Sequence, residues 1–212
     1  MMRQRCLLLV LLLSLLTGCG AGSPGDSPTV PAGATAASGE GEEGEMSTAI
    51  LEEQARALTE EEILTAYDRA VDAYGWFYLE TLPESGGPHT VDGQQYYRVV
   101  YPGMENLADL QAYLRGLFSE ELVDSLLEGD PAPLYRDIDG ELYVLPMERE
   151  SDALKGASSI QIKPVSQTAY SVDVTVDLLD TPGGNVVGVE CYTFPYVFEQ
   201  DRWVFDEFRM IY

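Results

Sequence analysis

Few side chains in this sequence are suited to nucleophilic or metal chemistry. The chain contains one histidine, His89, and three cysteines, of which Cys191 lies in an apolar run over residues 186–198. A cysteine in such a run is expected to be a buried small hydrophobe, because a nucleophilic thiol needs a base beside it. His89 follows the turn-forming residues 83–88, so it is expected in a loop. We therefore expect no catalytic residues, no metal site and no cofactor.

Carboxylates are abundant: the chain has 36 Asp and Glu residues, 12 Lys and Arg residues and a formal net charge of -24. Asp137, Asp139 and Glu141 could suggest calcium, but they lack the later Glu and the loop length of an EF-hand. A hairpin with solvated acidic positions is the preferred interpretation. This negative charge argues against nucleic acid as a partner and suits a basic partner. The alternative is that the acidic residues only keep the protein soluble.

The cysteine at position 19 has a distinctive context. Cys19 ends a Leu-Thr-Gly-Cys run that follows a basic start and an apolar segment over residues 7–16. This pattern resembles a bacterial lipoprotein signal, and the apolar segment is shorter than the about 20 residues that span a bilayer. The resemblance implies cleavage after Gly18, acylation of Cys19 and an extracytoplasmic protein anchored to the cell membrane by lipid. An ordinary secretory signal is the alternative.

Composition divides the chain into three parts. Residues 1–18 form the predicted signal peptide, and residues 19–46 combine the lipidated cysteine with an acidic tether rich in Gly, Ala, Ser, Pro and Thr. Such a tether buries too little apolar surface to offset its ordering entropy, so we expect it to be flexible. Residues 47–212 have the size of one ordinary domain, which we expect to be a monomer. A single remaining thiol, Cys191, allows no intrachain disulfide in this domain.

Helices are predicted in the first half of this domain. A capping box at Thr59 and Glu62 begins a helix that extends to about Leu82 with one aromatic face. Asn106 and Ser119 are predicted N-caps of two shorter helices, and a Gly-Asp-Pro run ends the helical region. We expect the aromatic face of the first helix to pack on a sheet.

Strands are predicted mainly in the second half, as an antiparallel meander with an Asp139-Gly140 hairpin turn. The predicted strands cover residues 95–101, 134–138, 141–145, 160–162, 170–177, 186–198 and 202–212. Helices on one face of an antiparallel sheet make an α+β fold. We expect N-terminal helices packed on a curved antiparallel β-sheet, in a cystatin-like or nuclear-transport-factor-like cone.

The last strands carry six aromatic side chains that are expected either in the core or around a ligand pocket. Strand aromatics usually fill the core, and the pocket is the open alternative. A pocket would lie on the concave face of the sheet. The six residues are Tyr192, Phe194, Tyr196, Phe198, Trp203 and Phe205.

The order of several aromatic and turn motifs resembles a known family. These motifs are Tyr74-Gly75-Trp76-Phe77, Tyr96-Tyr97-Arg98-Val99-Val100, Phe118-Ser119-Glu120-Glu121, the hairpin over residues 135–143 and the terminal Trp203-Val204-Phe205-Asp206-Glu207-Phe208. Over about residues 60–212 the chain resembles the IseA-like exported inhibitors of bacterial D,L-endopeptidases of Gram-positive bacteria. The shared motifs define a fold and carry no catalytic signature.

The resemblance implies a non-enzymatic protein that inhibits a cell-wall cysteine endopeptidase, which cuts the peptide stems of peptidoglycan. Such an inhibitor places a loop in the active-site cleft, and two long polar loops are candidates, over residues 84–94 and 147–158. Glu148, Glu150 and Asp152 of the second loop suit a basic rim and are the predicted binding residues. An ordinary solvated connection is the alternative for either loop. The lipid anchor and tether depart from the family pattern, so the identity of the target stays open.

These observations leave three candidate functions. The leading prediction is a membrane-tethered, extracytoplasmic inhibitor or modulator of a peptidoglycan D,L-endopeptidase, which would control autolysis. The second is a lipoprotein that binds a small ligand or wall fragment on the concave sheet face. The third is an enzyme that uses acid–base chemistry on Asp and Tyr, which a buried, solvent-reachable carboxyl group with a raised pKa would favour.

Overall fold

The computed structural model describes residues 56–129 and 131–211. The predicted signal peptide (1–18), Cys19 and the tether (19–46) therefore lie outside the described residues. Within the described part of the chain, no helix combines the length and the hydropathy needed to cross a membrane.

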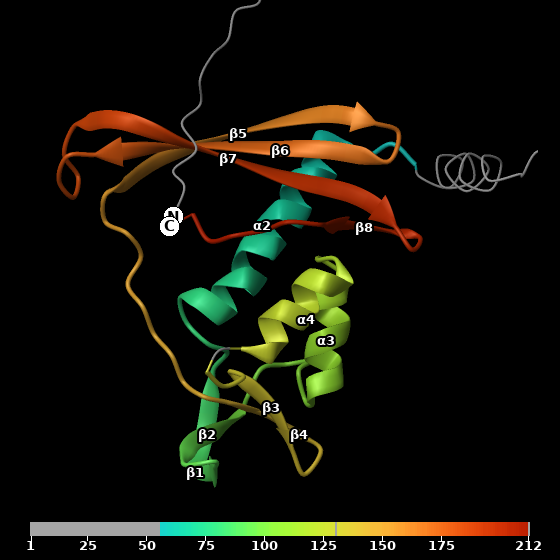
Figure 1. Ribbon diagram of the computed structural model, residues 1–212, viewed down its shortest axis with the longest axis vertical. Helices are drawn as coiled ribbons and strands as arrows, with labels where there is room; N and C mark the ends of the chain where they lie inside the picture. Colours follow the sequence, from blue (N-terminus) through green and yellow to red (C-terminus); the bar gives the residue numbers. More distant parts are fainter. Residues whose placement is uncertain (1–55, 130, 212) are drawn as a thin grey trace, which may run out of the picture.

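Helix α2 (Glu60–Tyr78) runs through the middle of the molecule, beneath the sheet drawn at the top of Figure 1. It begins with the predicted capping box, in which Thr59 Oγ1 accepts from Glu62 N at 3.2 Å and the Glu62 carboxylate accepts from Thr59 N at 2.9 Å. Two backbone donors at the helix start are satisfied in this way. The helix ends at Tyr78 and not near Leu82, because Glu80 pairs with Glu148 in a short antiparallel bridge.

Two short helices, α3 (Leu107–Arg115) and α4 (Glu120–Glu128), pack beside the long helix. Asn106 caps α3 as predicted, since its Oδ1 accepts from Asp109 N at 3.0 Å. Ser119 stands at the N-cap of α4, but its hydroxyl donates to the carbonyl oxygen of Asp206 at 3.3 Å and does not cap the helix. Ser119 therefore ties α4 to the C-terminal segment.

The sheet drawn at the bottom of Figure 1 has the antiparallel order β1-β2-β4-β3. Its strands are β1 (Glu84–Val91), β2 (Gln94–Val99), β3 (Tyr135–Ile138) and β4 (Glu141–Val144). The predicted turn at Asp139 and Gly140 is confirmed, with positive φ angles of 55° and 84° that suit a type I′ hairpin.

The prediction of a loop over residues 84–94, including His89, is wrong. The equivalent pair Asp92 and Gly93, with φ angles of 53° and 82°, joins β1 to β2 as a second hairpin. His89 lies in β1, opposite Tyr96. Two glycines and a proline suggested a loop, but β1 is an edge strand, where missing side chains and a missing N–H are tolerated.

The second sheet has the antiparallel order β5-β6-β7-β8. It contains β5 (Lys155–Ser166), β6 (Ala169–Leu179), β7 (Val186–Glu199) and β8 (Arg202–Phe205). The β3–β4 hairpin, which we predicted in this meander, instead pairs with β2 through Tyr97 and Val144. The strands therefore divide into two sheets, and a long connection crosses from one to the other (Figure 1).

The hydrophobic core is continuous from the β1–β4 sheet to the β5–β8 sheet, and part of it lies between α2 and the inner face of the latter. Tyr67 of α2 contacts Phe194 of β7, with ring centroids 5.8 Å apart, and Phe205 of β8 at 6.2 Å. Val172, Val174 and Val176 alternate along β6, are fully buried and belong to the same core. The α+β fold with curved antiparallel sheets is confirmed, whereas the cystatin-like or nuclear-transport-factor-like cone stays a prediction.

Candidate functional site

The nucleophile and base candidates lie in different sheets. His89 is exposed on edge strand β1, where its ring contacts Tyr143 at 5.8 Å. Cys191 is half-buried on β7, opposite Thr175 of β6. The structure does not bring these two side chains together. Within the described residues, no group of three or more His, Cys, Asp and Glu side chains is placed to hold a metal ion.

Among the described residues, three carboxyl groups have clearly shifted pKa values, and all three shifts are downward. A hydrogen bond from Arg56 lowers the pKa of Glu62 to about 2. The backbone N–H of Asn185 lowers the pKa of Asp180. Burial would raise the pKa of Asp173, but hydrogen bonds from three neighbouring side chains outweigh it and lower the pKa. These groups are held ionised, so none of the three is a proton donor at neutral pH.

The segment between β4 and β5, residues 145–154, is called the β4–β5 connection. Its first half is fixed to the end of α2 by two backbone hydrogen bonds. Thr81 N donates to the carbonyl oxygen of Met147 at 3.1 Å, and Arg149 N donates to that of Leu79 at 2.7 Å. The pairing forms a short antiparallel bridge. The backbone of this otherwise irregular segment is therefore held against a rigid helix.

The predicted binding residues Glu148, Glu150 and Asp152 all lie on the β4–β5 connection and are exposed. Asp152 Oδ1 accepts from Leu154 N at 3.0 Å, which shapes the turn into β5. Within residues 56–129 and 131–211, none of the three carboxylates takes part in an ion pair. The connection therefore presents three unpaired negative charges, of which Glu148 lies between the two residues that are hydrogen-bonded to Leu79 and Thr81.

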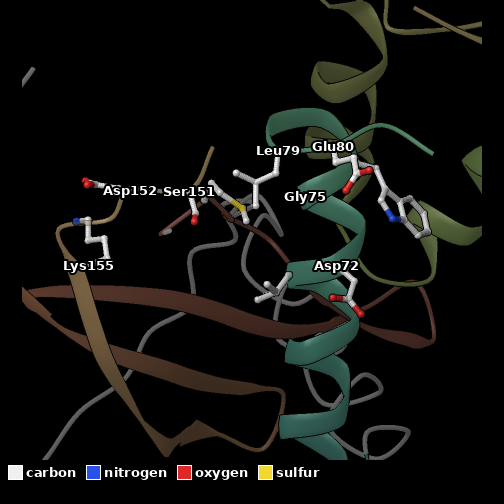
Figure 2. A pocket seen from close by; sticks show the side chains of 10 residues that line it. Asp72, Gly75, Leu79, Glu80, Ser151, Asp152 and Lys155 are labelled. Carbon is white, nitrogen blue, oxygen red and sulfur yellow. The ribbon is translucent and has the colours of Figure 1, made fainter. Parts of the chain in front are cut away.

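A cavity of about 470 Å³ lies between the second half of α2 and the β4–β5 connection, and we name it the α2 groove (Figure 2). Of the three predicted binding residues only Asp152 lines it, together with Ser151 and, from α2, Asp72. In Figure 2, Leu79 points toward Ser151, Asp152 and Lys155, whereas the carboxylate of Asp72 lies on the other side of the helix. The complete lining is Val71, Asp72, Gly75, Trp76, Leu79, Glu80, Ser151, Asp152, Lys155 and Met210.

Lys155 is the only cationic side chain that lines the α2 groove. Its Nζ forms an ion pair with Glu190 and a hydrogen bond with the hydroxyl of Tyr192 at 3.2 Å. Burial lowers the pKa of Lys155, but the hydrogen bonds to Glu190 and Tyr192 outweigh it and raise the pKa. The cation is thus neutralised by Glu190, while Asp72 and Glu80 leave a surplus of negative charge in the groove.

Comparisons with known proteins do not assign this chain to a family. No protein-family model matches the sequence, and no curated protein matches it. Its function is therefore inferred from its own side chains.

The six strand aromatics line neither the α2 groove nor a second cavity, of about 700 Å³. Phe194, Tyr196 and Phe205 are buried in the core, and burial raises the pKa of Tyr196 to about 12. The second cavity lies beside the first half of the β4–β5 connection, where Met147 and Arg149 line it.

Sequence reasoning missed three residues of the α2 groove, namely Asp72, Trp76 and Glu80. They follow one another at intervals of four along and just beyond α2, outside the aromatic face that packs on the sheet. The sequence contained one signal for this site: Trp76 lies outside the apolar face of the amphipathic helix, although tryptophan side chains are on average highly buried.

Proposed function

We propose that this chain is a membrane-tethered, extracytoplasmic inhibitor or modulator of a peptidoglycan D,L-endopeptidase, and that it is not an enzyme. The β4–β5 connection supports this function most directly. It carries Glu148, Glu150 and Asp152, and its backbone is hydrogen-bonded to Leu79 and Thr81 at Met147 and Arg149. A loop that is already ordered loses less conformational entropy on binding, and its negative charges suit the basic rim of an enzyme cleft.

The proposed location supports the same function. Lipidation at Cys19 would hold the protein at the outer surface of the cell membrane, close to the wall. A tether of about 27 residues of this composition spans on the order of 30 Å, which lets the folded part reach wall enzymes. The partner would be a cell-wall cysteine endopeptidase, bound by one copy of this chain.

The positions of the reactive side chains also favour binding over catalysis. His89 and Cys191 belong to different sheets, and the carboxyl groups with clear pKa shifts are held ionised. The buried inner face of the β5–β8 sheet gives no support to a ligand site there.

The test is an inhibition assay with the full chain in detergent micelles, a D,L-endopeptidase and peptidoglycan. We expect the release of soluble peptide fragments to fall at molar excess of this chain. Replacing three charges on the connection, E148Q, E150Q and D152N, should weaken inhibition by about tenfold, because three rim contacts are lost together. Undiminished hydrolysis in the presence of the unmodified chain would rule out the proposed function.

A matched control removes three carboxylates elsewhere on the surface. Asp124 and Glu128 of α4 and Asp139 of the β3–β4 turn are exposed and lie outside the connection. The variant D124N, E128Q, D139N has the same net charge as the connection variant. It should inhibit as well as the unmodified chain, which separates a local contact from a general effect of acidity.

A further inference from the structure

Three aromatic rings form a patch on the side of α2 that faces away from the β5–β8 sheet. We name Trp76, Tyr101 and Tyr113 the aromatic patch. The ring centroid of Trp76 lies 5.7 Å from that of Tyr101 and 5.4 Å from that of Tyr113. Tyr101 is 40% exposed, and its neighbour Val100 is 48% exposed. Aromatic and apolar surface that is gathered and left exposed in this way marks a binding surface more often than scattered apolar residues do.

The polar ends of these rings are not used within the fold. Across residues 56–129 and 131–211, the Trp76 indole N–H and the hydroxyls of Tyr101 and Tyr113 have no hydrogen-bond partner. Two tyrosines of the core behave differently: Tyr96 OH donates to Pro133 O at 2.9 Å, and Tyr135 OH accepts from Leu82 N at 2.9 Å. The patch therefore offers both aromatic faces and polar ends to a ligand.

Trp76 belongs both to the aromatic patch and to the α2 groove. Asp72 and Glu80 stand about one helical turn on either side of Trp76, and both line the groove. Neither carboxylate is in an ion pair within the described ranges. Ionised carboxylates accept hydrogen bonds only, so a ligand at this position must offer donors. The groove volume of about 470 Å³ falls within the range of small-ligand sites.

We infer that the aromatic patch and the α2 groove together bind a neutral, N-acetylated saccharide. The faces of the rings attract the C–H groups of a sugar ring, and Asp72 and Glu80 accept from its hydroxyl and amide donors. An anionic polymer is repelled by a chain of net charge -24. An organic cation fits less well, because the Arg69 guanidinium already lies 5.4 Å from the centre of the Tyr113 ring. A protein partner is the other occupant that exposed Tyr and Trp side chains suit, and the endopeptidase inhibition of Tyr101→Ala distinguishes it below.

This inference goes beyond the proposed function, because the saccharide site and the acidic β4–β5 connection use different side chains apart from Asp152. The experiment uses the full chain carrying Trp203→Phe, which leaves Trp76 as the only tryptophan. Trp203 Nε1 is buried without a hydrogen-bond partner in the described residues, so this change loses no hydrogen bond. Titration with the soluble tetramer of β-1,4-linked N-acetylglucosamine should give a saturable change in Trp76 fluorescence.

Two variants in this background locate the site. Tyr101→Ala removes an exposed ring and Asp72→Asn removes one acceptor charge, and each should weaken binding by about fivefold. Asp68→Asn makes the same charge change at an exposed position of α2 outside the groove, and it should bind like the parent. Circular dichroism of each variant establishes that it is folded.

Two outcomes would overturn the inference. One is the lack of a saturable change in Trp76 fluorescence up to about 10 mM saccharide, a concentration above the millimolar dissociation constants of weak specific complexes. The other is unchanged affinity in both Tyr101→Ala and Asp72→Asn. If the parent binds no saccharide while Tyr101→Ala loses endopeptidase inhibition, the patch is a protein interface. Saccharide binding without any inhibition would leave this inference standing and refute the proposed function.

Discussion

The two long sides of α2 are covered in different ways. On the side that faces the β5–β8 sheet, Tyr67 is 2% exposed and packs among the rings of Phe194, Phe205 and Phe208. On the outer side, Asp72, Trp76 and Glu80 line an open groove next to the β4–β5 connection (Figure 2). One helix therefore supplies both core side chains and side chains that line a groove. The wide apolar face contributes more to the free energy of folding than the outer side does, because it buries aromatic surface and the outer side chains stay solvated.

Because of this difference, we expect substitutions on the two sides of α2 to have different effects on stability. Inner-side changes leave cavities or unpaired polar groups in a close-packed interior, whereas outer-side changes are solvated. Substitutions in the core should therefore lower the free energy of unfolding, whereas substitutions in the site should weaken binding and leave the free energy of unfolding nearly unchanged.

The largest effect is expected for Phe194→Ala on β7. Phe194 is 1% exposed and stacks on Phe208, with ring centroids 4.6 Å apart. Its removal leaves a cavity and should lower the free energy of unfolding by about 3–5 kcal/mol, measured by urea denaturation. Val187→Ala on the same strand, at a position 66% exposed, should change it by less than about 0.5 kcal/mol. Similar values for the two variants would show that the inner face is loosely packed.

A smaller effect is expected for Tyr135→Phe, close to the end of α2. The Tyr135 hydroxyl accepts from Leu82 N at 2.9 Å and donates to Trp76 O at 3.1 Å, and burial raises its pKa, so it stays neutral. Without this hydroxyl, the buried Leu82 N–H is unpaired, which should cost about 1–3 kcal/mol in thermal or chemical unfolding. The control Tyr143→Phe alters a half-buried tyrosine with no hydroxyl bond in the described ranges. An equal cost for the control would contradict this assignment.

A pH-dependent effect is expected for Lys155→Met in the α2 groove. The pKa of Lys155 is raised above its ordinary value of 10.5, so its charge contributes to stability fully below that value. The contribution is lost as the pH rises through the folded-state pKa. The variant should therefore be less stable by about 1 kcal/mol at pH 7, and the difference should shrink in alkaline solution.

The control for this titration is Lys163→Met. Lys163 pairs with Asp173 at 2.7 Å on the other side of the β5–β8 sheet, where its side chain is 54% exposed. Screening by solvent should keep its effect below about 0.5 kcal/mol. A difference between Lys155→Met and the unmodified chain that is constant with pH would mean that packing of the lysine stem, not its charge, stabilises the fold.

The smallest effect on stability is expected for Asp72→Asn. Its carboxylate is exposed and has no ion-pair partner in the part of the chain described, so the melting temperature should be nearly unchanged, with less than about 0.5 kcal/mol lost. Differential scanning calorimetry measures this directly. A loss above about 1 kcal/mol would make the outer side of α2 a structural surface and remove the contrast between the two sides.

Much of the fold was predictable because its signals are local. The capping boxes at Thr59 and Asn106 and the turn at Asp139 and Gly140 form where the sequence places them. Their hydrogen bonds join residues a few positions apart, so no distant partner is needed. Strand β1 was not predicted because its glycines and proline indicate a loop. They are tolerated here because β1 lies at the edge of its sheet.

Less of the candidate site was predictable. Glu148, Glu150 and Asp152 were recognised as exposed acidic side chains, but only Asp152 lines the α2 groove. Asp72 and Trp76 were missed, since a surface position on a helix has no sequence mark that tells which segment will lie opposite it.

The α+β class, the helix starts, the turn at Asp139 and Gly140 and the high negative charge all follow from the sequence alone. Only the tertiary structure decided that the β3–β4 hairpin pairs with β2, and that the β4–β5 connection returns along the end of α2 to form a groove. The physical reason is distance along the chain. Caps, turns and alternation arise from neighbouring residues, whereas sheet partners and grooves arise from competition among distant segments for the same buried surface.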